Sequence, residues 1–222
     1  MSREFTDERL RELAAQFRCP IGEQGLKTGE NMFKTNKHIT EISMDILNPR
    51  PNETVMEIGC GVSRQAEILF NKFPDTTFWG VEMSPDMLQV AQEVNREKIN
   101  QGKAAFFFSD GKTLPLPNSS CHKIFTVNTL YFWEQPKEYL MEIHRVLAPT
   151  GRFCLTFAID EFMGKLPFSQ YGFTLYNQAT AEALFQDLPF SKVSVRTETE
   201  PHVSHVSDYA DRKVVFLLVQ KE

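Results

Sequence analysis

The sequence predicts an α/β fold in which a mostly parallel sheet of seven strands carries helices on both faces. Three observations predict it. Short apolar runs alternate with helical patterns from about residue 53 to residue 158. A turn rich in glycine follows the first of these runs. After residue 160 the alternation stops, and two adjacent strand-like runs predict an antiparallel hairpin at the C-terminal edge of the sheet.

Two helices are expected before the sheet begins. Apolar residues recur on one face of residues 6–18, and Thr6 is a suitable cap. A loop containing glycine is expected over 19–29, followed by a second helix over roughly 30–47. We therefore interpret residues 1–50 as an N-terminal helical cap.

Residues 51–222 are expected to form the main domain. The expected strands are 53–58, 77–82, 104–109, 122–128, 152–158, 190–197 and 213–219, and helical patterns fill 63–72, 85–100, 136–147 and 179–187. Ser84 and Pro85 are typical of a helix start, since serine caps and proline suits the first helical position. Residues 160–178, rich in Gly, Phe and Tyr, are a candidate substrate lid, although a packed surface insertion remains an alternative.

Composition excludes several classes of function. The formal charge is −5 with no basic stripe, so we expect no nucleic-acid partner. No apolar run approaches the length of a membrane span, and the charged N-terminus is not typical of a secretory signal. The four cysteines lie far apart, which is typical of reduced thiols in a cytoplasmic protein. His202 and His205 are spaced like metal ligands, but no further ligand cluster accompanies them, so no metal is expected.

Two strand ends carry the most informative residues. The first strand ends near Glu57, and Gly59 and Gly61 follow two positions apart. Glycine is favoured where a chain turns sharply beside a ligand, because a side chain would block the turn or fill the ligand's space. Glu82 ends the next strand, 23 residues beyond Gly59. That separation suits a carboxylate that accepts hydrogen bonds from a ribose, so the pair predicts a nucleoside site.

Four segments together resemble the class I S-adenosylmethionine-dependent methyltransferases, in particular the type 11-like group that acts on small molecules. They are Glu57–Gly61, Gly80–Pro85, Ser109–Pro117 and Val146–Phe153. Each segment alone is weak evidence, whereas their order and spacing together are strong. The resemblance covers about residues 30–158 and implies a Rossmann-like sheet, S-adenosylmethionine as cofactor and S-adenosylhomocysteine as product.

The resemblance also implies roles for residues after the first two strands. The turn formed by Glu57, Gly59, Cys60 and Gly61 would pass under the methionyl part of the cofactor. Glu82 would bind both ribose hydroxyls.

Other implied contacts lie further along the chain. Met83 would pack on the adenine, and Asp110 would accept a hydrogen bond from the adenine amino group, with the Gly111 backbone nearby. Asn128 would offer its backbone carbonyl to the amino group of the cofactor.

An N-terminal segment closes over the cofactor in many relatives, and Met32 and Asn36 are the candidates here. One departure from the family concerns Ser63, which stands where a third glycine is often found. Serine is small enough to fit there and could cap the following helix, so cofactor binding is expected to survive.

The resemblance implies an enzyme that moves a methyl group by in-line displacement to an oxygen, nitrogen or carbon atom of a small organic acceptor. Such a reaction needs alignment more than a catalytic motif, because the donor is already activated. Tyr131 is the candidate catalytic residue, and it or Glu134 could bind or deprotonate the acceptor. Packing of this aromatic segment against the next helix explains it equally well.

Two other functions stay open. A nicotinamide-dependent oxidoreductase also uses a glycine turn and a distant acid, but its fingerprint would place glycine where Arg64 stands. A catalytically silent, cofactor-binding partner subunit could retain the same fold. The sequence does not specify the oligomeric state.

Overall fold

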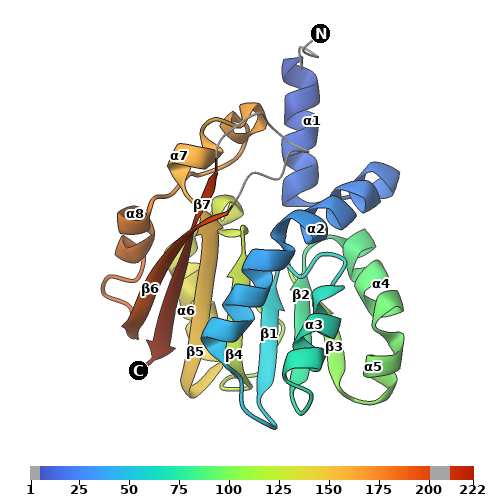
Figure 1. Cartoon of the computed structure of the whole chain (residues 1–222), viewed down its shortest axis with the longest axis vertical. Helices are drawn as coiled ribbons and strands as arrows, with labels where there is room; N and C mark the ends of the chain where they lie inside the picture. Colours follow the sequence, from blue (N-terminus) through green and yellow to red (C-terminus); the bar gives the residue numbers. More distant parts are fainter. Residues whose placement is uncertain (1–5, 201–210) are drawn as a thin grey trace.

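The computed structural model describes residues 6–200 and 211–222 (Figure 1). Its core is a seven-stranded sheet in the order β3-β2-β1-β4-β5-β7-β6. The strands are β1 Thr54–Ile58, β2 Thr77–Glu82, β3 Ala104–Phe108, β4 Cys121–Val127, β5 Leu147–Ala158, β6 Phe190–Glu200 and β7 Arg212–Lys221. The first five strands are parallel, and β7 pairs antiparallel with both β5 and β6. The predicted fold class is confirmed, including the C-terminal hairpin.

Helices cover both faces of this sheet. They are α1 Asp7–Arg18, α2 Gly22–Leu47, α3 Gln65–Lys72, α4 Pro85–Val94, α5 Arg96–Asn100, α6 Pro136–Val146, α7 Asp160–Met163 and α8 Gln178–Ala183, with 3₁₀ turns η1 Leu130–Phe132 and η2 Pro167–Gln170. On one face, α2 and α3 bury Ile39, Met44 and Leu69 against the sheet. On the other, α6 buries Leu140 and Ile143. Figure 1 shows α1 and the first half of α2 extending beyond the ends of β1 and β2.

The expected loop over 19–29 is wrong for most of its length, because α2 begins at Gly22. The glycines in this stretch serve close packing. A Cβ on Gly25 would lie 2.6 Å from the backbone carbon of Pro20, and one on Gly29 would lie 2.5 Å from Met87 Sδ. Glycine weakens a helix by about 1 kcal/mol relative to alanine, so its presence suggested a loop, but tertiary packing decides the structure here.

Ser63, which the sequence offers as a cap, does not cap α3. The helix begins at Gln65 with Arg64 at the N-cap and no side-chain cap. Ser63 is buried, and its Oγ has no hydrogen-bond partner in the described part of the chain. Its backbone has φ +51°, the left-handed conformation that glycine adopts most easily. Ser63 therefore adopts a backbone conformation that favours glycine.

Residues 160–178 contain α7 and η2 and are packed against α1. The rings of Phe17 and Phe168 have centroids 4.6 Å apart, and Phe168 also packs against Phe173. This segment lies beside the N-terminal helix at the upper end of the sheet in Figure 1.

All four cysteines are free thiols, and three of them are buried, as the sequence predicted. In the described residues, no helix is both long and apolar enough to cross a membrane. His202 and His205 lie outside the described residues. The cytoplasmic location stays a prediction.

Candidate functional site

The eleven residues predicted to bind cofactor line one cavity at the carboxyl ends of β1, β2 and β4. They are Met32, Asn36, Glu57, Gly59, Cys60, Gly61, Glu82, Met83, Asp110, Gly111 and Asn128. They come from α2, from the ends of β1 and β2, and from the loops after β1, β2, β3 and β4. In open α/β folds, ligands bind at the carboxyl ends of the parallel strands, where the strand order reverses. Here this point lies between β1 and β4, because β2 and β3 follow on one side of β1 and β4 and β5 on the other.

The glycine turn after β1 leaves room beside the cavity. Gly59 has φ +73°, and a Cβ there would lie 2.5 Å from Thr129 Cγ2. Gly61 has φ +53°, but a Cβ there would meet nothing within 4 Å. The first glycine is thus required by the protein's own packing. The second leaves a space that a ligand can occupy, which fits the predicted cofactor.

The Glu82 side chain is held in one orientation by the backbone around it. Its Oε2 accepts a hydrogen bond from Gly61 N at 2.8 Å, and its Oε1 accepts from Met83 N at 2.8 Å and Ser84 N at 2.9 Å. Burial raises the pKa of Glu82, although these backbone hydrogen bonds oppose the rise. Glu82 therefore joins the turn after β1 to the loop after β2. Three of the roughly four lone-pair sites of its carboxylate are occupied, and the remaining site on Oε2 is open to a hydroxyl donor.

Gln65 is a site residue that the sequence reasoning missed. Its Nε2 donates to Glu57 Oε2 at 2.6 Å and to Cys60 O at 2.9 Å, so one amide fixes both the acid and the turn. Burial raises the pKa of Glu57 well above its usual range, and the hydrogen bond from Gln65 opposes this. Glutamine at the first position of a helix gives no sequence signal of this contact.

Glu57→Gln is expected to raise the free energy of unfolding at pH 7. The neutral amide avoids burying a charge and can still accept the hydrogen bond from Gln65. Because the pKa of Glu57 is raised in the folded state, wild-type stability falls as pH rises through that pKa, so the gain should vanish at lower pH. Urea unfolding at several pH values, with the exposed Glu67→Gln as control, measures it. A loss of stability at pH 7 would contradict the expected effect.

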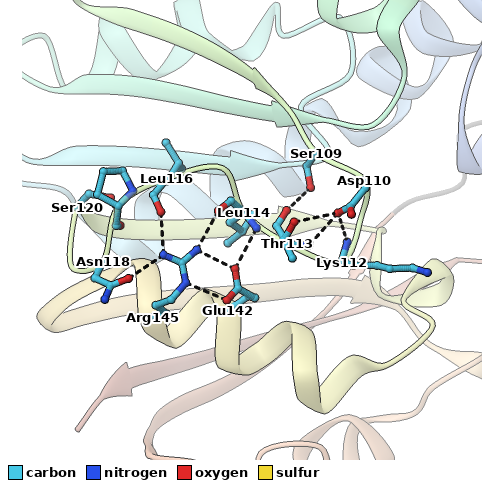
Figure 2. A network of polar contacts seen from close by, with 11 residues as sticks. Ser109, Asp110, Lys112, Thr113, Leu114, Leu116, Asn118, Ser120, Glu142 and Arg145 are labelled. Carbon is cyan, nitrogen blue, oxygen red and sulfur yellow. Dashed lines mark hydrogen bonds and ion pairs between the residues drawn. The ribbon is translucent and has the colours of Figure 1, made fainter.

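The loop from β3 to β4 carries Asp110 and Gly111 and contains no helix over residues 109–120. Asp110 Oδ1 accepts hydrogen bonds from Lys112 N and Thr113 N, each 2.9 Å long, and these bonds lower the pKa of the exposed Asp110 carboxyl (Figure 2). The position of a Cβ at Gly111 would be 4.0 Å from Met83 Cε. The two predicted adenine contacts therefore lie close together across the cavity.

Arg145 on α6 donates five hydrogen bonds, three to this loop and two to Glu142 on the same helix (Figure 2). Its Nη1 donates to Leu116 O at 2.8 Å and to Asn118 Oδ1 at 2.9 Å. Its Nη2 donates to Leu114 O at 2.9 Å, and the guanidinium also binds the Glu142 carboxylate through Nε and Nη2. Glu142 Oε2 in turn accepts from Leu114 N at 3.1 Å. A loop without a helix is thus held by one side chain and its partner.

Arg145→Lys is expected to weaken binding of S-adenosylhomocysteine about tenfold, a loss of about 1.4 kcal/mol. Lysine cannot reproduce the planar, five-donor geometry, so the loop that carries Asp110 should loosen. Calorimetric titration measures the affinity, and the exposed Arg96→Lys is the matched control. Unchanged affinity in both variants would show that the loop does not depend on Arg145.

Asn128 and Asn36 join β4 to α2 at one end of the cavity. Asn128 has φ +58°, a left-handed conformation that asparagine tolerates better than most residues. Its Oδ1 accepts from Ala158 N at 3.0 Å, and its Nδ2 donates to Asn36 Oδ1 at 3.1 Å. The side chain therefore fixes the residue whose carbonyl is the predicted contact for the cofactor's amino group.

Tyr131 stands apart from the cavity lining. It is buried, and its hydroxyl points at two acceptors, Ala158 O at 2.8 Å and Asn128 Oδ1 at 3.0 Å. Burial raises the pKa of this phenol above its usual range. Its catalytic role stays a prediction, and Tyr131→Phe tests it by turnover.

Aromatic and charged side chains complete the cavity. The aromatic residues are Phe17, Phe33, Phe132, Trp133 and Tyr139. Glu134 accepts from Arg18 at 2.7 Å and forms an ion pair with Lys112 at 3.3 Å, and all three residues line the cavity. These pairs connect the end of α1, the β3–β4 loop and the segment after η1. Sequence reasoning singled out Glu134 but not its partners, because they lie far apart in the chain.

Comparison with known proteins gives one family and several structural neighbours. Residues 56–155 match the methyltransferase domain family. An O-methyltransferase of Pyrenophora dematioidea is 26% identical over 130 residues, which cover 57% of this chain and 48% of that protein. The matched region spans about half or less of the length of the first curated relatives.

Among solved structures, a complex of the Trm112 methyltransferase activator with a methyltransferase from Haloferax volcanii has a TM-score of 0.75 at 16% identity, covering 88% of this chain and 93% of that one. A geranyl diphosphate C-methyltransferase of Streptomyces coelicolor, bound to S-adenosylhomocysteine, has a TM-score of 0.69 at 12% identity, covering 84% and 77%. At these identities the likeness shows a shared fold.

Proposed function

We propose that this chain is an S-adenosylmethionine-dependent methyltransferase that methylates a small organic acceptor. Residues 56–155 match the methyltransferase domain family, and the sheet has the fold of solved methyltransferases. The observation that carries the proposal is the convergence of all eleven predicted cofactor residues on one cavity. They come from separate segments of the sequence, so a shared cavity supports one ligand.

S-adenosylmethionine supplies an activated methyl group on a sulfonium whose leaving group is neutral. The residues of this chain would bind it along the cavity. Glu82 would accept a hydrogen bond from a ribose hydroxyl at the open site on Oε2, and Met83 and Gly111 would enclose the adenine, with Asp110 at its amino group. The Glu57–Gly61 turn and the Asn128 carbonyl would hold the amino-acid end. Asp110 Oδ1 is already engaged by its own loop, so its Oδ2 is the oxygen proposed for the adenine.

The acceptor would lie against the aromatic part of the cavity. Phe17, Phe33, Phe132 and Trp133 offer apolar surface that suits a small acceptor with an apolar face. Curated and structural neighbours include an O-methyltransferase and a C-methyltransferase, so the acceptor atom stays open among oxygen, nitrogen and carbon. We propose neither a metal nor a nucleic-acid partner for this reaction.

The N-terminal cap and the candidate lid would both cover the cavity. Residues 1–50 would cover the cofactor through α2, and 160–178 would cover the acceptor. Packing of Phe17 on Phe168, at 4.6 Å between ring centroids, and of Phe132 on Phe173, also at 4.6 Å, supports a lid that excludes water.

The test is methyl transfer from S-adenosylmethionine with an isotopically labelled methyl group to a panel of phenols, quinones, amines and activated carbon acids. Label should appear in one acceptor class and be absent with Glu82→Ala. If the wild type binds S-adenosylhomocysteine but labels no acceptor in a wide panel, the catalytically silent partner becomes the better account.

A further inference from the structure

We propose that Arg212 is a positioning residue for the amino-acid end of the cofactor, acting through Asn36 and Asn128. This inference rests on the proposed function. Arg212 is the first residue of β7 and does not line the cavity. Its side chain nevertheless makes the contacts that hold two lining residues in place.

Arg212 contacts α2 at two points. Its Nη1 donates to Asn36 Oδ1 at 3.0 Å, and its Nη2 donates to Thr35 O at 2.8 Å. The rest of the guanidinium binds Glu200, the last residue of β6, through Nε at 2.5 Å and through Nη2. One planar group therefore joins the ends of both hairpin strands to the middle of α2.

This ion pair is shielded from solvent. The side chains of Arg212 and Glu200 are 17% and 8% exposed, far less than the surface pairs of this protein such as Lys27–Glu23. Exposed pairs contribute little because water and salt screen them, whereas a shielded pair with additional hydrogen bonds holds its geometry. The guanidinium is therefore a fixed anchor for Asn36.

Asn36 passes this constraint to Asn128. Its Oδ1 accepts from both Arg212 Nη1 and Asn128 Nδ2, the latter at 3.1 Å. The other end of the Asn128 amide is held by Ala158 N and by the Tyr131 hydroxyl, each 3.0 Å from Oδ1. The Asn128 side chain is thus held at both of its polar atoms.

The direction of the Asn128 carbonyl depends on this arrangement. Its backbone is left-handed, with φ +58°, and a non-glycine residue keeps such a conformation only where its surroundings enforce it. If Arg212 no longer fixes Asn36, the amide of Asn128 loses a fixed acceptor and its backbone can relax. The carbonyl would then turn away from the position proposed for the cofactor's amino group, while the ribose and adenine contacts would be unaffected.

The experiment compares two ligands in wild type and Arg212→Lys. One is S-adenosylhomocysteine, and the other is the same thioether with its amino group replaced by hydrogen. Lysine retains a charge opposite Glu200 but cannot contact Asn36, Thr35 and Glu200 together. We expect S-adenosylhomocysteine to bind about tenfold more weakly to the variant, and the analogue without the amino group to lose less than twofold. Arg212→Gln is the second variant if Arg212→Lys unfolds below the assay temperature.

Arg145→Lys is the matched control, because it disturbs the loop at the adenine end and should weaken both ligands equally. An equal loss for both ligands in Arg212→Lys would overturn the proposal and assign Arg212 a purely structural role. Unchanged affinity for S-adenosylhomocysteine would overturn it as well. Absence of binding to the wild type would instead be a failure of the proposed function, so the two failures are distinguishable.

Discussion

Glu82→Ala is expected to weaken S-adenosylhomocysteine binding at least about a hundredfold. The variant removes the acceptor proposed for the ribose, and a hydrogen bond to a charged group contributes roughly 1.5–3 kcal/mol. It also releases Gly61 N, Met83 N and Ser84 N, which now donate to the carboxylate and shape two cofactor loops. Calorimetric titration measures the affinity.

The control for this variant is Glu67→Ala, which removes an exposed carboxylate from α3. It should bind like the wild type. We expect Glu82→Ala to remain folded, because removal of a buried charge offsets part of the lost hydrogen bonding. A circular dichroism melt measures this. Wild-type affinity in folded Glu82→Ala would show that the ribose contact has been assigned to the wrong residue.

Gly61→Ala is expected to abolish S-adenosylhomocysteine binding while the protein remains folded. The added methyl group meets no protein atom within 4 Å, so it would project into space that we assign to the cofactor. The left-handed backbone, φ +53°, adds a cost of roughly 1–2 kcal/mol to folding. The loss of binding free energy should therefore be much larger than the loss of folding free energy, which lowers the melting temperature only slightly.

Gly102→Ala separates these two effects. Gly102 has φ +68° and equally open surroundings, but it lies in the turn between α5 and β3 and does not line the cavity. Both variants should lose similar stability, and only Gly61→Ala should lose binding. Equal binding by the two variants would mean that the space beside Gly61 is not used by the cofactor.

The fold could be predicted because each strand has a local signal. Apolar runs, capping residues and the change of pattern after residue 160 specified seven strands and their C-terminal hairpin, which the structure confirms. Nine of the eleven cofactor residues lie at or just after strand ends in family motifs, and Met32 and Asn36 lie on α2; their contacts with a cofactor stay predictions. Such signals lie within a few residues of one another along the chain.

Supporting side-chain contacts between different elements left no comparable signal. Gln65 supports Glu57, Arg145 supports the Asp110 loop and Arg212 supports Asn36, and in each case the supporting side chain is an ordinary polar residue on a helix or strand. The start of α2 was missed for a related reason. Gly25 and Gly29 are read locally as a loop, but they are small so that Pro20 and Met87 can approach the helix.

The most direct test of the central claim is calorimetric titration of the purified protein with S-adenosylhomocysteine, with NAD and NADP measured in parallel. A nicotinamide fingerprint would need glycine where Arg64 stands, and Arg64 instead binds Glu30 of α2 through Nε and Nη2, at 2.9 Å and 2.6 Å from Oε1. We therefore predict micromolar binding of S-adenosylhomocysteine, its loss in Glu82→Ala, and no binding of either dinucleotide. Binding of a dinucleotide without S-adenosylhomocysteine, or binding of none of the three, would contradict the assignment of this cavity to S-adenosylmethionine.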